Sequence, residues 1–274
     1  MILKFKDEGH QYISTNGEDI KWISATSIIH KFTEPFNAEE SALKASKNPK
    51  SKWYKMTPEA IQAKWKEINQ KSLTLGTAYH AMREEATLSA ESIQKKGKPL
   101  PVVKPIMVDG WKLAPNQKLS EGIYPEHMVY LKSAGICGQS DLVEVIDGFV
   151  NILDYKSNRE IKTEGFMAWD PISKSRREKM MLTPFSHLPA CNLSEYNLQL
   201  SLYMYIILKH NPRLKPGTLT IEHVVFKSIG EDEFGYPIYA TDSSGAPIVD
   251  YVVPYELPYL KEEVIALINT AKAA

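Results

Sequence analysis

The stretch of residues 138–156 constrains the fold more than any other part of the chain. Two apolar-rich runs flank Asp147-Gly148, a dipeptide that between such runs favours a two-residue type I′ turn and so predicts a β-hairpin. Such a turn fixes the strand register, and counting outward from it places Asp141 opposite Asp154. Directly opposed residues share a face of the sheet, with Cβ atoms about 5 Å apart. Lys156 lies two residues beyond Asp154 and therefore projects from that same face.

Two carboxylates and one ammonium are thus expected at the open end of this hairpin. Like charges directly opposite each other destabilise a sheet, so something has to offset their repulsion. A divalent cation would do so, and carboxylate oxygens suit Mg²⁺ or Mn²⁺. The alternative is a solvated surface pair with a neighbouring salt bridge, which is common at strand ends.

Composition narrows the class of protein. The 274 residues suffice for a sizeable core, and 33 basic residues balance 33 acidic ones, so any nucleic-acid surface has to be local. Cys137 and Cys191 are the only cysteines, which argues against a disulfide scaffold and excludes a four-cysteine iron–sulfur cluster within the chain. No apolar run approaches about 18 residues, and the start resembles neither a signal nor a transit peptide, which favours a cytoplasmic protein without a membrane span.

The first part of the chain predicts short strands followed by helices. The expected elements are a hairpin of residues 2–5 and 11–14, a third strand at 19–23, a short helix capped by Thr26 or Ser27, and a longer helix that Thr57 and Pro58 open.

Between these helices lies a basic segment, residues 44–55, with five lysines, no acid and two adjacent aromatic residues. Lysines interleaved with aromatic side chains suit a nucleic-acid backbone and stacked bases. Lys52, Trp53 and Tyr54 are therefore candidate DNA-binding residues. The alternative is a solvated loop whose aromatic side chains pack into the core.

A second helical segment near Gly76 carries His80 and Glu84, which are four residues apart and hence on one face. Glu84 is placed to accept the second ring N–H of His80 and to fix its orientation toward a metal. A lone histidine on a helix is alternatively an ordinary structural residue. Glu126 lies near the start of a strand predicted over 124–131, directly before the hairpin, and is a candidate third acid; the alternative is a solvated glutamate.

After the hairpin the sequence predicts a long polar connection, residues 157–194, with a basic cluster that includes Arg176 and Arg177. This cluster is either a surface for a phosphate backbone or an ordinary charged loop. The other expected elements are a Lys/Pro-rich loop at 95–105, a helix at 196–210, a strand at 219–227, a hairpin at 236–253 around Asp242–Gly245, and a closing helix at 255–271.

Four blocks, in this order, resemble the PD-(D/E)XK nuclease superfamily, most closely its RecB-type exonuclease branch. They are Gly76-Thr77-x-x-His80, Gly138-x-x-Asp141, Ile152-Leu-Asp154-Tyr-Lys156 and Gln199-x-x-x-Tyr203. Ser24-Ala-Thr-Ser-Ile-Ile29 is further similar to the N-terminal segment of phage-encoded members and of the mitochondrial genome maintenance exonuclease group. Ser140 stands where the superfamily's name has proline, a replacement that is common in RecB-type members.

The resemblance implies an α/β (α+β) chain with a restriction-endonuclease-like core, in which a central mixed β-sheet is flanked by helices and preceded by an N-terminal helical or loop insertion. It implies one nuclease domain over residues 1–274. Within it we expect N-terminal strands and a basic helical arch over 1–71, a catalytic core over 72–228, and a C-terminal hairpin and helix over 229–274.

The resemblance also implies a Mg²⁺- or Mn²⁺-dependent deoxyribonuclease that uses one or two ions and no iron–sulfur cluster. The implied metal ligands are His80, Asp141, Asp154 and the backbone carbonyl of Tyr155. The other implied roles are for Lys156 to position the attacking hydroxide, Glu126 to complete a second ion's shell or orient water, Gln199 to bond Lys156 or a phosphate oxygen, and Tyr203 to contact the DNA backbone or fill the core. Beside a cation, the pKa of Lys156 is expected to be depressed.

The implied substrate is DNA, degraded from ends or single strands in replication, recombination or repair, in the cytoplasm of a bacterium or a phage-infected cell. A separate helicase, recombinase or single-strand-binding protein is the implied partner, since the chain has no P-loop motif of its own. The alternatives are a structure- or site-specific endonuclease and a nuclease-fold DNA-binding module without turnover.

Overall fold

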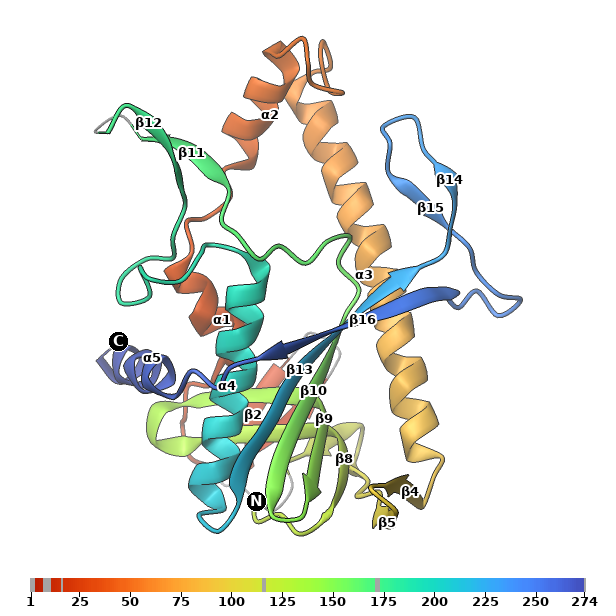
Figure 1. Cartoon of the computed structure of the whole chain (residues 1–274), viewed down its shortest axis with the longest axis vertical. Coiled ribbons are helices and arrows are strands. Elements are labelled where there is room, and N and C mark those ends of the chain that lie inside the picture. The colour runs from red at the N-terminus through yellow and green to blue at the C-terminus, as the bar shows by residue number, and fades with distance from the viewer. Residues whose placement is uncertain (1–2, 7–10, 16, 115–116, 171–172, 274) are drawn as a thin grey trace.

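The computed structural model describes residues 3–6, 11–15, 17–114, 117–170 and 173–273. Its centre is a six-stranded mixed β-sheet (Figure 1). In spatial order the strands are β16 (Val249–Leu257), β13 (Lys215–Phe226), β10 (Phe149–Lys156) and β9 (Ile136–Ile146), with β8 (Gly122–Leu131) and β3 (Ile23–Ser24) both paired to β9. The pairs β10–β13 and β3–β9 are parallel and the others antiparallel. A mixed α/β fold with a central mixed sheet is thereby confirmed.

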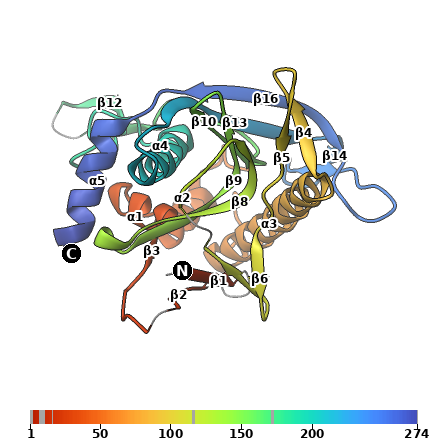
Figure 2. The same cartoon turned by 90° about the horizontal axis from the view of Figure 1, so that it is seen from below.

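Helices flank both faces of this sheet. The helix α4 (Asn192–His210) packs its apolar side chains on one face, with α5 (Lys261–Ala273) beside it. The helix α3 (Pro58–Leu88) crosses the opposite face, where Tyr79 packs on Tyr155 with ring centroids 5.7 Å apart. Figure 2 shows α4 and α3 on opposite sides of the curved strands. No helix in the described part of the chain is both long and apolar enough to cross a membrane.

The central hairpin forms in the predicted register. Asp147 and Gly148 both have positive φ angles, 53° and 77°, as a type I′ turn requires. The ladder of paired residues runs from Ile146–Phe149 to Leu142–Leu153. The next pair outward is therefore Asp141 and Asp154, as the sequence predicts.

Charges clamp the closed end of this hairpin. Lys98 Nζ lies 2.7 Å from Asp147 Oδ1 and 3.0 Å from Glu121 Oε1, and Glu121 also accepts the Asp147 N–H. Lys98 belongs to the hairpin of β4 (Ser92–Lys95) and β5 (Lys98–Pro101), where we expected a loop over 95–105. That prediction was wrong because residues 96 and 97 both have positive φ angles and form a tight turn between the strands.

The N-terminal residues form a second sheet of four strands. As predicted, β1 (Leu3–Lys6) pairs with β2 (Gln11–Ser14); β1 also pairs with β7 (Trp111–Leu113), which pairs with β6 (Ile106–Val108). The polar turn expected at residues 6–9 lies mostly outside the described residues, and the strand predicted at 19–23 is reduced to β3.

Both predicted caps of the first short helix were wrong. The helix α1 (Ala25–Ile29) is capped by Ser24, whose hydroxyl accepts the N–H of Ser27 at 3.1 Å. The helix starts two or three residues earlier than expected because this hydroxyl already satisfies the N–H of Ser27. Short 3₁₀ helices follow at His30–Phe32 and, after β8, at Lys132–Ala134.

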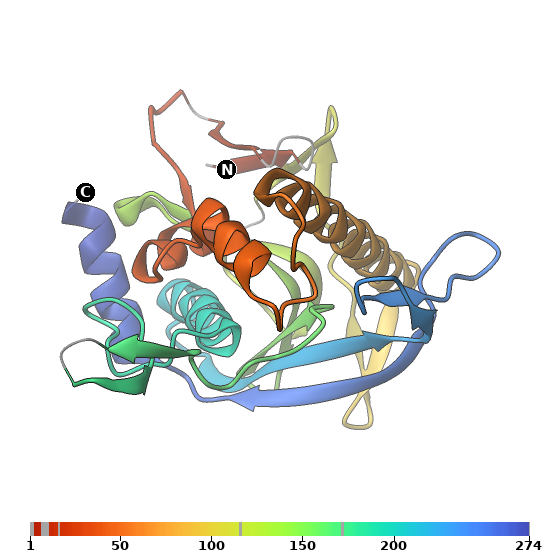
Figure 3. The ribbon, with the colours of Figure 1, turned by 90° about the horizontal axis from the view of Figure 1, so that it is seen from above.

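The two helical segments predicted on either side of residue 72 are one continuous helix, α3, capped by Thr57 as expected. Its first half lies beside α2 (Ala38–Lys47), as Figure 3 shows from above. Together they enclose a small cluster of buried side chains, which we call the Trp53 cluster. It contains Ala42, Trp53 and Ile61, with Trp65, Phe234 and Tyr236 packed against them. The division of the chain at residues 71 and 72 stays a prediction, and α3 runs across it.

Three expectations for the second half of the chain have to be corrected. The connection over 157–194 contains a hairpin of β11 (Met167–Asp170) and β12 (Ser175–Glu178). The turn predicted around Asp242–Gly245 forms, with Thr241 and Pro247 paired in an antiparallel bridge. The strands beside it pair elsewhere, β15 (Pro237–Tyr239) with β14 (Ser228–Glu231) and β16 with β13. Because β16 extends to Leu257, the closing helix begins at Lys261 rather than at 255.

Candidate metal and catalytic site

Three acidic side chains lie in a row across neighbouring strands of the central sheet. The register places Asp141 of β9 opposite Asp154 of β10. On the other side of β9 it places Glu126 of β8 opposite Asp141, between the pairs Pro125–Leu142 and His127–Ser140. Glu126 has a φ angle of 49°, a left-handed conformation that is uncommon outside glycine and that recurs at functional sites. The predicted opposed pair of acids is therefore extended by a third.

His80, Glu126 and Asp141 offer ligand atoms that all lie within 4.8 Å of one another. His80 reaches the sheet from α3, with Nδ1 3.3 Å from Asp141 Oδ2. The same carboxylate oxygen accepts the backbone N–H of Tyr155 at 2.7 Å, and the side-chain amide of Gln139 donates to Glu126. One imidazole and two carboxylates are donors that suit Mn²⁺ or Mg²⁺. The Tyr155 carbonyl as a further ligand stays a prediction.

Asp154 stands outside this group of ligands and faces Lys156. Its side chain is 2% exposed, and its Oδ2 lies 2.5 Å from Lys156 Nζ. The ammonium also lies 4.8 Å from the centre of the Tyr196 ring. The group that the structure brings within ligand distance thus has Glu126 where we expected Asp154.

Burial and mutual repulsion shift the pKa values of these acids. Burial and the charge of Asp141 raise the pKa of Glu126 to about 8 and that of Asp154 to about 6. Burial acts on Asp141 too, but the hydrogen bond and charge of His80 outweigh it and lower the pKa of Asp141. Without a cation, Glu126 therefore keeps its proton at neutral pH while Asp141 is ionised. A cation that binds there would favour the charged form of Glu126.

The two basic groups of the site both gain from the acids. Burial alone would lower the pKa of Lys156, but the charges of Asp154 and Asp141 outweigh it and raise that pKa. Burial likewise opposes the charged form of His80, and Asp141 raises its pKa overall. We expected a depressed pKa for Lys156 beside a cation; with the carboxylates alone the shift has the opposite direction.

Glycines of two motif blocks allow the helices to approach the site. A Cβ atom on Gly138 would lie 2.5 Å from Tyr203 Cε1, and one on Gly76 would lie 2.8 Å from Ser157 Oγ. Because Gly138 has no side chain, the Tyr203 ring of α4 packs directly on the strand that carries Asp141. Gly76 similarly lets α3 approach the chain just beyond β10.

The predicted roles of Gln199 and Tyr203 have to be corrected. The side-chain amide of Gln199 donates to the Tyr203 hydroxyl at 3.0 Å rather than bonding Lys156, and the alternative bond to a phosphate oxygen stays a prediction. Tyr203 is 3% exposed and belongs to the main core under the sheet. A contact with the DNA backbone was therefore the wrong prediction for Tyr203, and the core-filling alternative is confirmed.

Trp53 does not present its ring to solvent. It is 5% exposed and stacks on Phe234 with ring centroids 4.7 Å apart. Lys52 Nζ donates to the Phe234 carbonyl at 2.6 Å and lies 3.5 Å from the centre of the Tyr236 ring. The prediction that Trp53 stacks on bases was wrong, because its apolar ring is buried in the Trp53 cluster; Tyr54 is exposed.

The predicted orienting role of Glu84 was also wrong. Its carboxylate pairs with Lys112 Nζ at 3.2 Å, and Asp141 takes the position beside the His80 ring. His80 and Glu84 do share a face of α3, but the neighbouring β7 supplies a cation within reach of Glu84. An i,i+4 spacing makes such a contact available without selecting it.

Arg176 and Arg177 lie on the exposed hairpin of β11 and β12. Trp169 is directly opposite Arg176 in the register and is 65% exposed. Arg177 is 3.4 Å from Asp170. We did not single out Trp169 from the sequence as an exposed aromatic residue beside these arginines. The available signal was a tryptophan inside a long polar connection.

An open cavity of about 520 Å³ gives access to Glu126, Asp141 and Lys156, and Asp154 lies behind its lining. One face of α3, with Asn69, Leu73, Gly76 and His80, forms one wall, and the end of β10 forms another. We call it the acidic cavity.

Comparison of the chain with models of protein families, with curated proteins and with solved structures finds no match in any of the three. A function therefore has to be inferred from the geometry of this chain's own residues. That geometry brings three of the four motif blocks to one site, from α3, β9 and β10, and packs the fourth, on α4, directly behind it.

Proposed function

We propose that this chain is a Mg²⁺- or Mn²⁺-dependent deoxyribonuclease that degrades DNA from ends or single strands. The observation that carries the proposal is the grouping of His80, Glu126 and Asp141 within 4.8 Å, beside the buried pair of Asp154 and Lys156. In this proposal the mixed sheet between α3 and α4 is a restriction-endonuclease-like core. A row of acids with an adjacent lysine supports phosphodiester hydrolysis. It fits the alternative interpretation, a solvated pair of charges at a strand end, less well.

The residues of the site have different roles in this proposal. A divalent cation held by His80, Glu126 and Asp141 would supply Lewis-acid activation of the scissile phosphate and of water. Lys156 stays protonated, because its pKa is raised, and so donates hydrogen bonds to a phosphate oxygen as negative charge builds up. Asp154 holds the ammonium in place at 2.5 Å. With a pKa of about 6 it is ionised at neutral pH and so keeps this ion pair.

A cleavage assay tests this proposal directly. Linear single- and double-stranded DNA, labelled at the 5′ or 3′ end, is incubated with the protein in Mg²⁺, Mn²⁺ or EDTA, alongside circular DNA of both kinds. We expect metal-dependent release of short products from linear DNA, from one labelled end, with circles left intact. Cleavage of circles would instead identify an endonuclease. Absence of cleavage in both metals, with DNA binding retained, would identify a binding module and overturn the proposal.

A further inference from the structure

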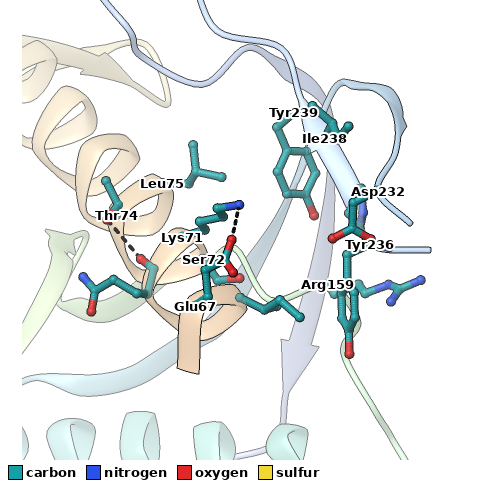
Figure 4. A pocket seen from close by; sticks show the side chains of 13 residues that line it. Glu67, Lys71, Ser72, Thr74, Leu75, Arg159, Asp232, Tyr236, Ile238 and Tyr239 are labelled. Carbon is teal, nitrogen blue, oxygen red and sulfur yellow. Dashed lines mark hydrogen bonds and ion pairs between the residues drawn. The ribbon is translucent and has the colours of Figure 1, made fainter. Parts of the chain in front are cut away.

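A second cavity adjoins the acidic cavity along α3. It has a volume of about 620 Å³ and lies between α3 and the hairpin of β14 and β15 (Figure 4). Its lining is mostly apolar and aromatic, with Ile68 and Leu75 on the helix and Tyr236, Ile238 and Tyr239 on the hairpin. We call it the apolar cavity.

The two cavities meet at shared chain segments. Ser72 lines both of them, so they occupy adjacent faces of the same helix. Lys156 lies at the acidic cavity, and Arg159 lines the apolar one. Lys156 and Arg159 are three residues apart in the chain, so their backbones are at most about 10 Å apart. A DNA strand held at Lys156 is therefore close enough to enter the apolar cavity as well.

The aromatic wall of the apolar cavity is held by cations and by the Trp53 cluster. Lys52 Nζ lies 3.5 Å and Arg159 Cζ 5.4 Å from the centre of the Tyr236 ring. Trp53 stacks on Phe234, in the turn before Tyr236. Tyr239 packs edge-on against a ring of β13 at 5.7 Å. These contacts fix the rings before any ligand arrives.

The acidic groups of this cavity already have partners. Glu67 pairs with Lys71 at 2.7 Å, the contact marked in Figure 4. Asp232 accepts the backbone N–H groups of Phe234 and Tyr236, each at 2.9 Å. Lys71 and Glu67 thus neutralise each other. The cavity therefore suits a flat, uncharged aromatic ring better than a phosphate.

We propose that the apolar cavity receives one unpaired base of the DNA strand whose phosphate lies at Lys156, an inference that rests on the proposed nuclease function. Every base has a π-face, so aromatic walls bind bases with little dependence on sequence. A base can enter a lateral cavity only when it has left the stack and its partner. The cavity therefore selects single strands or frayed ends.

Removing the base at single positions tests this inference without any protein variant. Single-stranded oligonucleotides, each with one abasic residue at a different distance from the cleaved end, are digested by the wild-type protein in Mg²⁺ or Mn²⁺. We expect one position at which cleavage at limiting DNA concentration slows about tenfold, the size expected of one lost base stack. Neighbouring positions change less.

Variants of the cavity wall provide the second test. Thr74 is exposed and lines the cavity from α3, so Thr74→Trp should fill it and abolish the dependence on the abasic position. Ile238→Ala removes apolar wall and should weaken that dependence. Ile229→Ala is the matched control, because it makes the same change on the paired strand β14 at an exposed residue that does not line the cavity. Thermal melting shows that each variant is folded.

A binding readout separates this inference from the nuclease activity. In EDTA, an oligonucleotide with 2-aminopurine at the sensitive position should change fluorescence on binding wild-type protein, and Thr74→Trp should remove the change. If the active wild type tolerates abasic residues equally at all positions, or Thr74→Trp leaves the fluorescence change intact, the inference is overturned and the nuclease proposal stands. If the wild type cleaves no DNA in either metal, the nuclease proposal falls, and the inference falls with it.

Discussion

The two cavities beside α3 are similar in volume, about 520 and 620 Å³, and opposite in chemistry. The acidic cavity is lined by Glu126 and Asp141, which project from paired strands, and burial and the charge of Asp141 raise the pKa of Glu126. In the apolar cavity Glu67 pairs with Lys71 and Asp232 accepts backbone N–H groups, and the walls are a helix face and a hairpin held by the Trp53 cluster. In our proposals the acidic cavity carries out the reaction and the apolar cavity binds a base, and each prediction tests one side of that division.

The largest effect is expected from Lys156 at the acidic cavity and from Asp154 behind it. Lys156→Ala and Asp154→Asn should each slow metal-dependent DNA cleavage about a thousandfold, because the first removes the ammonium proposed to bind the phosphate and the second removes the charge that holds this ammonium in place. Glu144→Gln is the control, since Glu144 is on the same hairpin but pairs with Lys95 outside the cavity. Release of labelled nucleotide measures the rates. Wild-type rates in both variants would refute the catalytic assignment.

The Trp53 cluster should respond in stability. Trp53→Ala should lower the free energy of unfolding by about 3 kcal/mol, since it removes a buried ring and leaves a cavity. Tyr54→Ala, at the exposed neighbouring ring, should change it by less than about 0.5 kcal/mol. Urea denaturation measures both. A Trp53→Ala variant of unchanged stability and reduced DNA affinity would restore the base-stacking role that the structure contradicts.

Metal affinity should depend on pH through Glu126. Its pKa is raised to about 8, so a metal that binds has to displace its proton at lower pH. The affinity for Mn²⁺, measured by calorimetry, should rise with pH by up to about tenfold per unit and level off above about pH 8. Glu126→Gln should weaken binding and flatten this dependence, whereas Glu144→Gln should do neither. An equally steep dependence in Glu126→Gln would assign the proton to another group.

The raised pKa of Glu126 also predicts how the stability of the metal-free protein depends on pH. Glu126 holds its proton in the folded state up to about pH 8 but loses it near pH 4.5 when unfolded. The folded state therefore binds more protons across this interval, and its contribution to stability falls as pH rises from about 4.5 to 8. Wild-type protein should lose stability relative to Glu126→Gln over that range in EDTA, as thermal melting would show. Parallel pH profiles for the two proteins would contradict the raised pKa.

The smallest effect is expected at the exposed hairpin of β11 and β12, outside both cavities. Arg176→Ala should weaken single-stranded DNA binding and reduce the slope of log affinity against log salt by about 0.7, the value for one lost phosphate contact. Arg213→Ala is the control, since Arg213 is exposed beyond the C-terminal end of α4. Fluorescence anisotropy at several salt concentrations measures both. Equal slopes in all three proteins would make this hairpin an ordinary charged surface.

Local patterns in the sequence predicted the acidic cavity better than the apolar one. The register of Asp141 and Asp154 follows from a two-residue turn only a few residues away. The importance of Glu126 depends on its left-handed backbone angle, which no local pattern indicated. The apolar cavity joins residues of α3 to residues of β15 that are more than 150 positions away in the chain. Sequence spacing carries no information about such contacts, which form only when the whole chain packs.

The burial of Trp53 shows why composition misled us. Lysines and aromatic residues within ten positions are typical of nucleic-acid surfaces, but the partner of the ring is Phe234, in a distant turn. Similarly, the pairing of β16 with β13 could not be read from the residues around Asp242, because the strand's partner lies beyond its nearest turn. Local turn chemistry predicted the turn at Asp242–Gly245, which forms, but the strands on either side of it pair with more distant partners.

The closed end of the central hairpin has a consequence for how this protein tolerates sequence change. The turn at Asp147-Gly148 lies about 20 Å along the strand from Asp141. One inserted residue there would exchange the faces of alternate side chains on one strand and separate Asp141 from Asp154. The contacts of Lys98 and Glu121 with the turn oppose such slippage. In a family of homologous sequences, the length of this surface turn should therefore vary as little as the acids themselves, although the turn touches neither metal nor substrate.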